Sequence, residues 1–158
     1  MKNWKMLILL FGPWLTFFVL GKQSFKKYLP TSVFSSLLIA IISEFAKSYK
    51  WWKVKTPLVP KLATDLTFVF GLFLPLNQWI FKLTYQKLWL YVVSNIVSDY
   101  LFAYPLTTLA EKFNIYKMKN MSRMQLFFLS LFVAFLNYLY QRFIIDSLPT
   151  NRKEKSLV

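Results

Sequence analysis

Residues 88–110 read LWLYVVSNIVSDYLFAYPLTTLA, a stretch that contains no lysine or arginine and a single acid, Asp99. An α-helix rises about 1.5 Å per residue, so this stretch is long enough to cross a hydrocarbon core of about 30 Å. Base-free windows of comparable character occur four more times, at residues 6–21, 28–46, 62–81 and 124–141. The first window is short, but Lys5 and Lys22 at its ends extend it if their ammonium groups reach outward.

The base-free windows predict an all-α integral membrane bundle of about five transmembrane helices with short loops. Backbone polar groups in lipid must be hydrogen-bonded within the protein, so a span is either a helix or a strand of a closed barrel. Barrel strands alternate apolar and polar residues, and residues 126–129 (LFFL) do not alternate. We expect a single domain over residues 1–148 and a short polar tail over residues 149–158, with spans at about 4–20, 30–46, 61–81, 88–110 and 123–145.

The composition favours a lipid environment. Hydrophobic residues make up 56% of the chain, aromatic residues make up 20%, and the mean hydropathy is +0.41. A single small soluble core could not bury that much apolar surface. The interfacial anchors that we expect at headgroup level, where amphipathic rings are favoured, are Trp51, Trp52, Trp79 and Trp89. Residues 47–61 surround two of them with lysines and are predicted to lie on the membrane surface.

The net charge of +14 does not indicate a nucleic-acid-binding protein, because the bases are spread over every loop and both ends. The partners that we expect are membrane lipids, including anionic headgroups, and a membrane-protein partner or a second copy of the chain. A slight excess of bases on the N-terminal side of the five predicted spans favours a cytoplasmic N-terminus.

Several kinds of chemistry are excluded by composition. The chain has no histidine, no cysteine and only three glycines. Ser-His-Asp catalysis, HExxH zinc sites, thiol chemistry and a glycine-rich phosphate loop are therefore all absent. We expect no catalytic residue, no cofactor and no metal site.

The candidate intramembrane polar site consists of Asn95, Asp99 and Asn137. Asp99 lies at the midpoint of the span 88–110, and Asn95 lies one turn before it on the same helical face. A carboxylate at that depth costs at least about 2.5–3.5 kcal/mol if it faces lipid, so we expect it to face the bundle interior. The site is either an ion or proton site or a set of hydrogen bonds between helices, with Asn137 as the first expected partner of Asp99.

Two candidate interfacial acids, Glu44 and Asp65, flank residues 47–61. A pair of carboxylates can hold a cation or perform acid–base chemistry. The structural alternative is that each acid pairs locally with a lysine and that Asp65 stabilises a helix N-terminus. Pro75 removes the hydrogen bond to the carbonyl of Gly71, which predicts a helix kink between those residues.

The chain resembles a family of small, uncharacterised polytopic membrane proteins of endospore-forming Gram-positive bacteria. The stretches that carry the resemblance are residues 28–30 (YLP), 50–53 (KWWK), Asp65, 79–85 (WIFKLTY), Asn95 with Asp99, and 104–106 (YPL). The resemblance implies a multi-pass protein of a bacterial plasma membrane or spore membrane. It implies no particular activity.

The function that the sequence favours is that of a non-enzymatic membrane scaffold or accessory subunit. The first alternative is small-ion or proton transport, or channel activity, centred on the polar wedge of residues 88–110. The second is an intramembrane lipid-modifying enzyme that uses Glu44 and Asp65. A scaffold needs no cavity, a transporter needs a cavity that reaches Asp99, and an enzyme needs both acids in one cleft.

Overall fold

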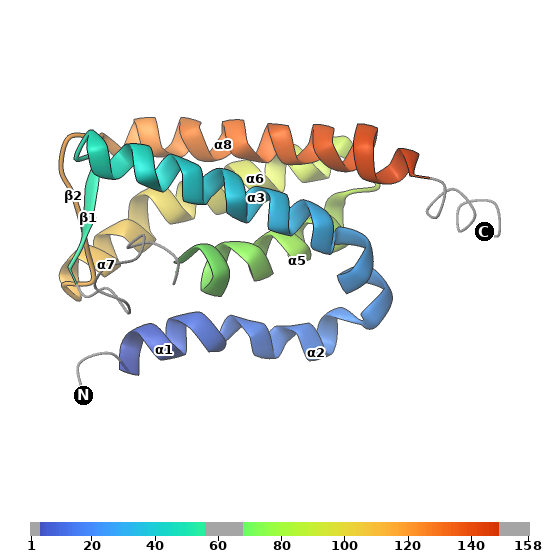
Figure 1. The fold of residues 1–158 in the computed structure, drawn as a ribbon, viewed down its shortest axis with the longest axis horizontal. Coiled ribbons are helices and arrows are strands. Elements are labelled where there is room, and N and C mark those ends of the chain that lie inside the picture. Colours follow the sequence, from blue (N-terminus) through green and yellow to red (C-terminus); the bar gives the residue numbers. More distant parts are fainter. Residues whose placement is uncertain (1–3, 56–67, 149–158) are drawn as a thin grey trace.

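The computed structural model describes residues 4–55 and 68–148, and in this part of the chain the helices run back and forth as five rods (Figure 1). The first rod contains α1 (Trp4–Phe11), the 3-10 turn η1 (Pro13–Thr16) and α2 (Phe17–Leu20), and the second is α3 (Lys22–Ser48). The third contains the π-helical turn η2 (Val69–Phe73) and α5 (Leu74–Thr84). The fourth contains α6 (Leu88–Leu101), the π turn η3 (Phe102–Leu106) and α7 (Thr107–Lys112). The fifth contains α8 (Arg123–Leu139), the π turn η4 (Tyr140–Ile144) and the 3-10 turn η5 (Ile145–Ser147).

Four of these rods form the body of the bundle, and the first lies at its edge. Helix α3 contacts α5 and α8, and α6 contacts the same two helices. The first rod is attached to the third by side-chain hydrogen bonds. Trp14 Nε1 donates to the carbonyl of Phe70 (2.8 Å), and Trp79 Nε1 donates to Thr16 Oγ1 (2.9 Å). Lys82 Nζ donates to the carbonyl of Leu20, which closes the end of the first rod (2.9 Å).

The second rod begins earlier than the sequence predicts. We expected the second span to begin near residue 30, whereas α3 is continuous from Lys22. Gly21 supplies the turn instead, with a φ of 85° that favours glycine. Pro30 therefore lies inside α3, where the helix continues through it without a backbone donor at that position.

Two of the π turns lie next to prolines. Turn η2 ends two residues before Pro75, at the kink that the sequence predicts, and η3 contains Pro105. A proline cannot donate to the α-helical ladder, so the preceding turn has no reason to keep α-helical spacing. Thr107, the first residue of α7, donates from its Oγ1 to the carbonyl of Phe102 at the start of η3 (2.8 Å).

A short antiparallel ribbon joins the two connections at one end of the bundle. Strand β1 (Trp52–Val54) pairs with β2 (Tyr116–Met118), with Lys53 opposite Lys117. We expected a membrane-surface segment at residues 52–54 and a short loop at residues 116–118. The ribbon was not predicted because each strand is three residues long and becomes a strand only through its partner, which is far away in the sequence.

The burial pattern of α3 is the reverse of that of a helix in a soluble protein. Its buried face carries small polar side chains, of which Thr31, Ser32, Ser35 and Ser36 are at most 3% exposed. Its exposed face carries Val33, Leu37, Ile41 and Phe45. Helices α6 and α8 likewise expose Val, Ile and Phe side chains and bury Asn95 and Asn137. Large apolar residues thus cover the outside of the bundle.

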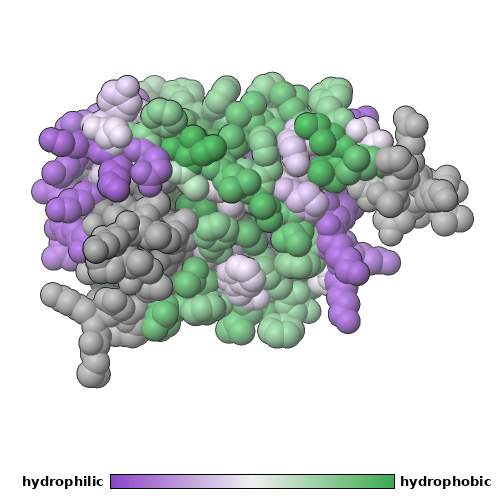
Figure 2. All heavy atoms as spheres, in the orientation of Figure 1, coloured by the Kyte–Doolittle hydropathy of each residue, from purple (hydrophilic) through white to green (hydrophobic). Residues whose placement is uncertain are grey.

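The apolar exterior forms a belt between two hydrophilic ends (Figure 2). Two helices in the described part of the chain are long and apolar enough to cross a membrane, Lys22–Ser48 and Arg123–Ser147. The ribbon end carries lysines of both connections, and the opposite end carries the bases that flank α3 and α5. The two ends of the rods are therefore polar and the middle is not.

A pair of adjacent substitutions on α3 tests this reversed packing. Ser36→Leu places a large side chain where the helices approach closely, and we expect it to lower the free energy of unfolding by about 1–3 kcal/mol. Leu37→Phe on the exposed face is the matched control and should change stability by less than about 0.5 kcal/mol. Thermal unfolding in detergent micelles measures both. Equal effects of the two substitutions would contradict the burial pattern.

Candidate functional site

The bundle encloses a pocket with a volume of about 270 Å³ between α3, α5, α6 and α8. It runs from polar side chains at mid-bundle, including Ser35, Asn77 and Asn95, to Trp52 and Ile115 at the ribbon end. Its walls are mostly Leu, Ile, Val and Phe. Turns η2 and η3 both contribute wall residues, so the irregular backbone beside Pro75 and at Pro105 lines the pocket.

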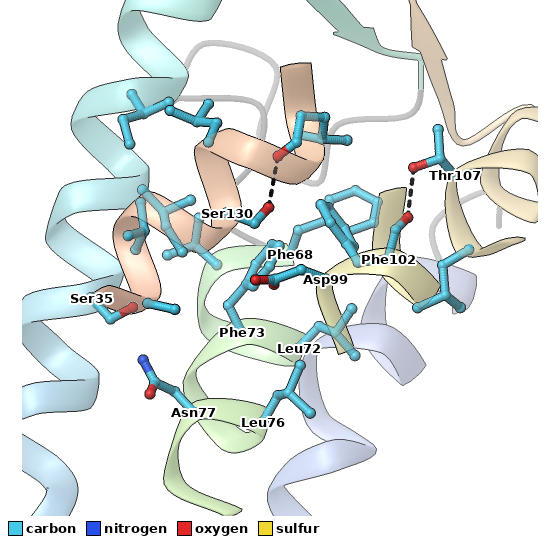
Figure 3. A pocket seen from close by; sticks show the side chains of 18 of the residues that line it. Ser35, Phe68, Leu72, Phe73, Leu76, Asn77, Asp99, Phe102, Thr107 and Ser130 are labelled. Atoms are coloured by element: carbon cyan, nitrogen blue, oxygen red, sulfur yellow. Dashed lines mark hydrogen bonds between the residues drawn. The ribbon is translucent and has the colours of Figure 1, made fainter. Parts of the chain in front are cut away.

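Asp99 lies in this pocket and has an unpaired oxygen. Figure 3 shows its carboxylate among Phe68, Leu72 and Phe73, with Phe102 beside it. Its Oδ2 atom is buried and has no hydrogen-bond partner among the described residues. Asp99 is also the single ionisable side chain among the described residues that line the pocket. A buried carboxylate oxygen without a partner is costly, so its presence calls for an explanation.

The three residues of the predicted polar site all line the pocket, but their pairing differs from the expected one. Asn137 Nδ2 donates to Ser35 Oγ on α3 (2.8 Å) and not to Asp99. Asn95 Nδ2 donates to the carbonyl of Tyr91 in its own helix (2.8 Å). The expected Asp99–Asn137 hydrogen bond is therefore wrong. The physical reason is that the hydroxyl of Ser35 on α3 takes the amide of Asn137.

One of the two predicted interfacial acids, Glu44, lies in the described part of the chain. Glu44 is exposed on α3 and is not among the described residues that line the pocket. Asp65 lies outside the described residues. The acid that pairs with a base in this part of the chain is Glu111, whose Oε2 lies 3.2 Å from Arg123 Nη2.

The four predicted anchor tryptophans have different surroundings. Trp89 is 63% exposed at the start of α6. Trp51 and Trp52 are half-buried beside the ribbon, and Trp52 also lines the pocket. Trp79 is half-buried against the first rod, with Lys82 Nζ 5.1 Å from the centre of its ring. Two of these rings therefore have roles in packing that the sequence did not indicate.

A second buried polar cluster lies at the opposite end of the bundle, and its groups are paired with one another. Tyr85 OH donates to Asp146 Oδ2 (2.6 Å), and Gln141 Nε2 donates to Asp146 Oδ1 (3.1 Å). Thr31 Oγ1 donates to Gln141 Oε1, which connects α3 to the C-terminal end of the fifth rod. A network with its members paired stabilises one packing arrangement. We assign this cluster to the fold and not to ligand binding.

Several buried polar groups were not predicted from the sequence, although a signal for some of them was present. Ser35 and Ser43 line the pocket, and they belong to the buried stripe of α3, whose members recur at helical spacing between Tyr28 and Ala46. That periodicity of small residues could have identified the inner face of the helix. The role of Asp146 had no such signal, because it lies past the base-free windows and its partners are far away in the sequence.

Comparison with protein-family models, curated proteins and solved structures found no match for this chain.

The unpaired oxygen of Asp99 leads to a stability prediction. Asp99→Leu removes a buried polar group and breaks no hydrogen bond within the described residues, so we expect the unfolding temperature to stay the same or rise. Asn137→Leu is the comparison, because it breaks the bond to Ser35 and should lower the free energy of unfolding by about 1 kcal/mol. Thermal unfolding in micelles distinguishes the two. A loss at Asp99 as large as that at Asn137 would assign it a structural role.

Proposed function

We propose that this chain is an integral membrane protein of five spans that binds a small, largely apolar molecule in the pocket beside Asp99. The observation that carries the proposal is the pocket itself, in which buried oxygens of Asp99, Asn137 and Ser43 have no partner within the described residues. A ligand that bonds to these atoms would offset their cost.

The membrane part of the proposal is supported by the reversed burial. A bundle that exposes Leu37, Ile41, Phe128 and Phe132 while it buries serine and asparagine is stable where its surroundings are apolar. Lysines and arginines at both ends would meet anionic headgroups. The resemblance noted above adds a bacterial plasma membrane or spore membrane as the proposed location.

The position of the pocket favours ligand binding over a purely scaffolding role. A scaffold that works by helix packing has no need of a cavity of about 270 Å³. The pocket occupies the ribbon half of the bundle, and the paired cluster around Asp146 fills the other half. A site at mid-depth that is closed on one side is the arrangement that transporters use, so transport of the bound molecule is a second candidate.

The membrane topology can be tested with single cysteines, because the natural chain has none. Lys53→Cys lies in the ribbon and Gln86→Cys lies in the turn between α5 and α6, at opposite ends of the rods (Figure 1). In intact cells, a membrane-impermeant maleimide should label one and not the other, and it should label both after permeabilisation. Leu37→Cys, on the exposed apolar face, should stay unlabelled throughout. Equal labelling of the first two in intact cells would mean that the third rod does not cross the membrane, which would contradict the proposal of five spans.

The pocket can be tested by photolabelling in lipid nanodiscs with a neutral diazirine derivative of adamantane. We expect labelled residues to include those of the pocket wall, such as Ile42 and Leu129. Val133→Trp fills the pocket and should abolish this labelling, whereas Phe132→Trp on the neighbouring exposed position should leave it unchanged. Thermal unfolding of both variants establishes that they are folded. Labelling confined to lipid-facing residues such as Phe128 would contradict the proposal.

A further inference from the structure

Four of the polar side chains that line the pocket use a hydrogen-bond donor within the protein, whereas the hydroxyl of Ser43 has no partner among the described residues. The amide donors of Asn137 and Asn95 bond to Ser35 Oγ and to the carbonyl of Tyr91. The hydroxyls of Ser130 and Thr107 donate to the carbonyls of Leu126 (2.9 Å) and Phe102 (2.8 Å). These side chains therefore direct their donors into the bundle. Their oxygen atoms keep lone pairs that a ligand can use.

Two further buried oxygen atoms of the pocket have no hydrogen-bond partner among the described residues, and both belong to groups that accept hydrogen bonds. Asn137 is 3% exposed, and its Oδ1, which can only accept a hydrogen bond, is buried and has no partner in the described part of the chain. Asp99 Oδ2 is in the same situation. An amide carbonyl and a carboxylate both require a donor, so a molecule that bonds to them must bring N–H or O–H groups. A ligand anion would be repelled by Asp99.

The charge of the pocket has one sign. Among the described residues of the lining, Asp99 is the only ionisable side chain, and no lysine or arginine accompanies it. A carboxylate among Phe68, Leu72 and Phe73 lacks a counter-charge, and a bound cation would supply one. The aromatic rings of the wall add favourable positions for a cation, because the face of each ring is electron-rich.

The size and the walls of the pocket select among cations. A bare metal ion would leave most of about 270 Å³ unfilled, and the described residues contain no group of three or more potential metal-ligating side chains. The lining is mostly aliphatic and aromatic, so the rest of the ligand must be apolar. Accordingly, we infer that the pocket binds a lipophilic organic cation, such as a protonated amine on a compact apolar body, with Asp99 as its counter-charge and the Asn137 carbonyl as a further acceptor. The inference rests on the proposed function, since it names the ligand class of the same pocket.

The test uses three competitors that share one apolar body and differ in charge, namely 1-adamantylamine, 1-adamantanol and 1-adamantanecarboxylate. Each competes with the neutral diazirine probe for the full-length protein in nanodiscs of zwitterionic lipid, which do not concentrate the amine electrostatically. We expect the amine to protect the pocket at a concentration at least about tenfold lower than the alcohol, because a charge-assisted hydrogen bond replaces a neutral one. The carboxylate should be the weakest competitor.

Two variants separate the Asp99 contact from general effects. Asp99→Asn keeps the shape of the side chain and should equalise the amine and the alcohol while pocket labelling by the neutral probe persists. Glu44→Gln removes an exposed acid outside the described pocket lining and should leave the amine preference unchanged.

The other outcomes each overturn a defined step. Equal protection by all three competitors, or an amine preference that survives Asp99→Asn, would refute the cation assignment and leave the pocket proposal standing. Protection by NaCl alone would indicate an inorganic ion instead. Absence of pocket labelling in the unaltered protein would refute the proposed function itself.

Discussion

The buried face of α3 is the constraint on which the rest of the structure depends. Small hydroxyl side chains at Thr31, Ser32, Ser35 and Ser36 let neighbouring helices approach closely, and two of them also bond to the fifth rod. In the membrane setting that we propose, lipid tails are as apolar as Leu or Phe, so helices would gain little from bringing large apolar side chains together. Close packing and hydrogen bonds between helices hold them together instead. The position of α3 against α5 and α8 then fixes where the pocket can form.

The bundle contains two buried polar groupings that differ in how well they are paired. At one end, Tyr85, Gln141 and Thr31 are joined through Asp146 and hold three rods together. At mid-bundle, Asp99 and Asn137 retain oxygens with no partner in the described structure. Both groupings contain one acid, so composition does not distinguish them. Their hydrogen bonding distinguishes them. An unpaired buried polar group lowers the stability of the fold, whereas a paired group contributes to it.

The irregular turns of the third and fourth rods contribute to the same arrangement. Turns η2 and η3 replace α-helical turns beside Pro75 and at Pro105, and both supply residues to the pocket wall. A π turn changes the direction in which the following side chains project and widens the helix locally. A proline inside a helix weakens it. Pro75 and Pro105 thus lie beside the pocket, where their irregular turns form part of the wall. Phe73 and Phe102, one from each turn, also contact each other edge to face, with ring centres 4.8 Å apart.

The sequence by itself determined that the chain forms apolar helical segments, about where they lie, and that Asn95, Asp99 and Asn137 are their notable polar residues. These features follow from local composition and from the length of base-free windows, which need no knowledge of neighbours. Only the tertiary structure decided that α3 begins at Lys22, that residues 52–54 pair with residues 116–118 and that Asn137 bonds to Ser35. It also decided that both oxygens of Asp146 are paired while Oδ2 of Asp99 has no partner among the described residues. Each of these depends on which of several available partners a polar group meets across the bundle. That choice is made by helix packing between residues up to about a hundred positions apart, such as Ser35 and Asn137, and no local pattern records it.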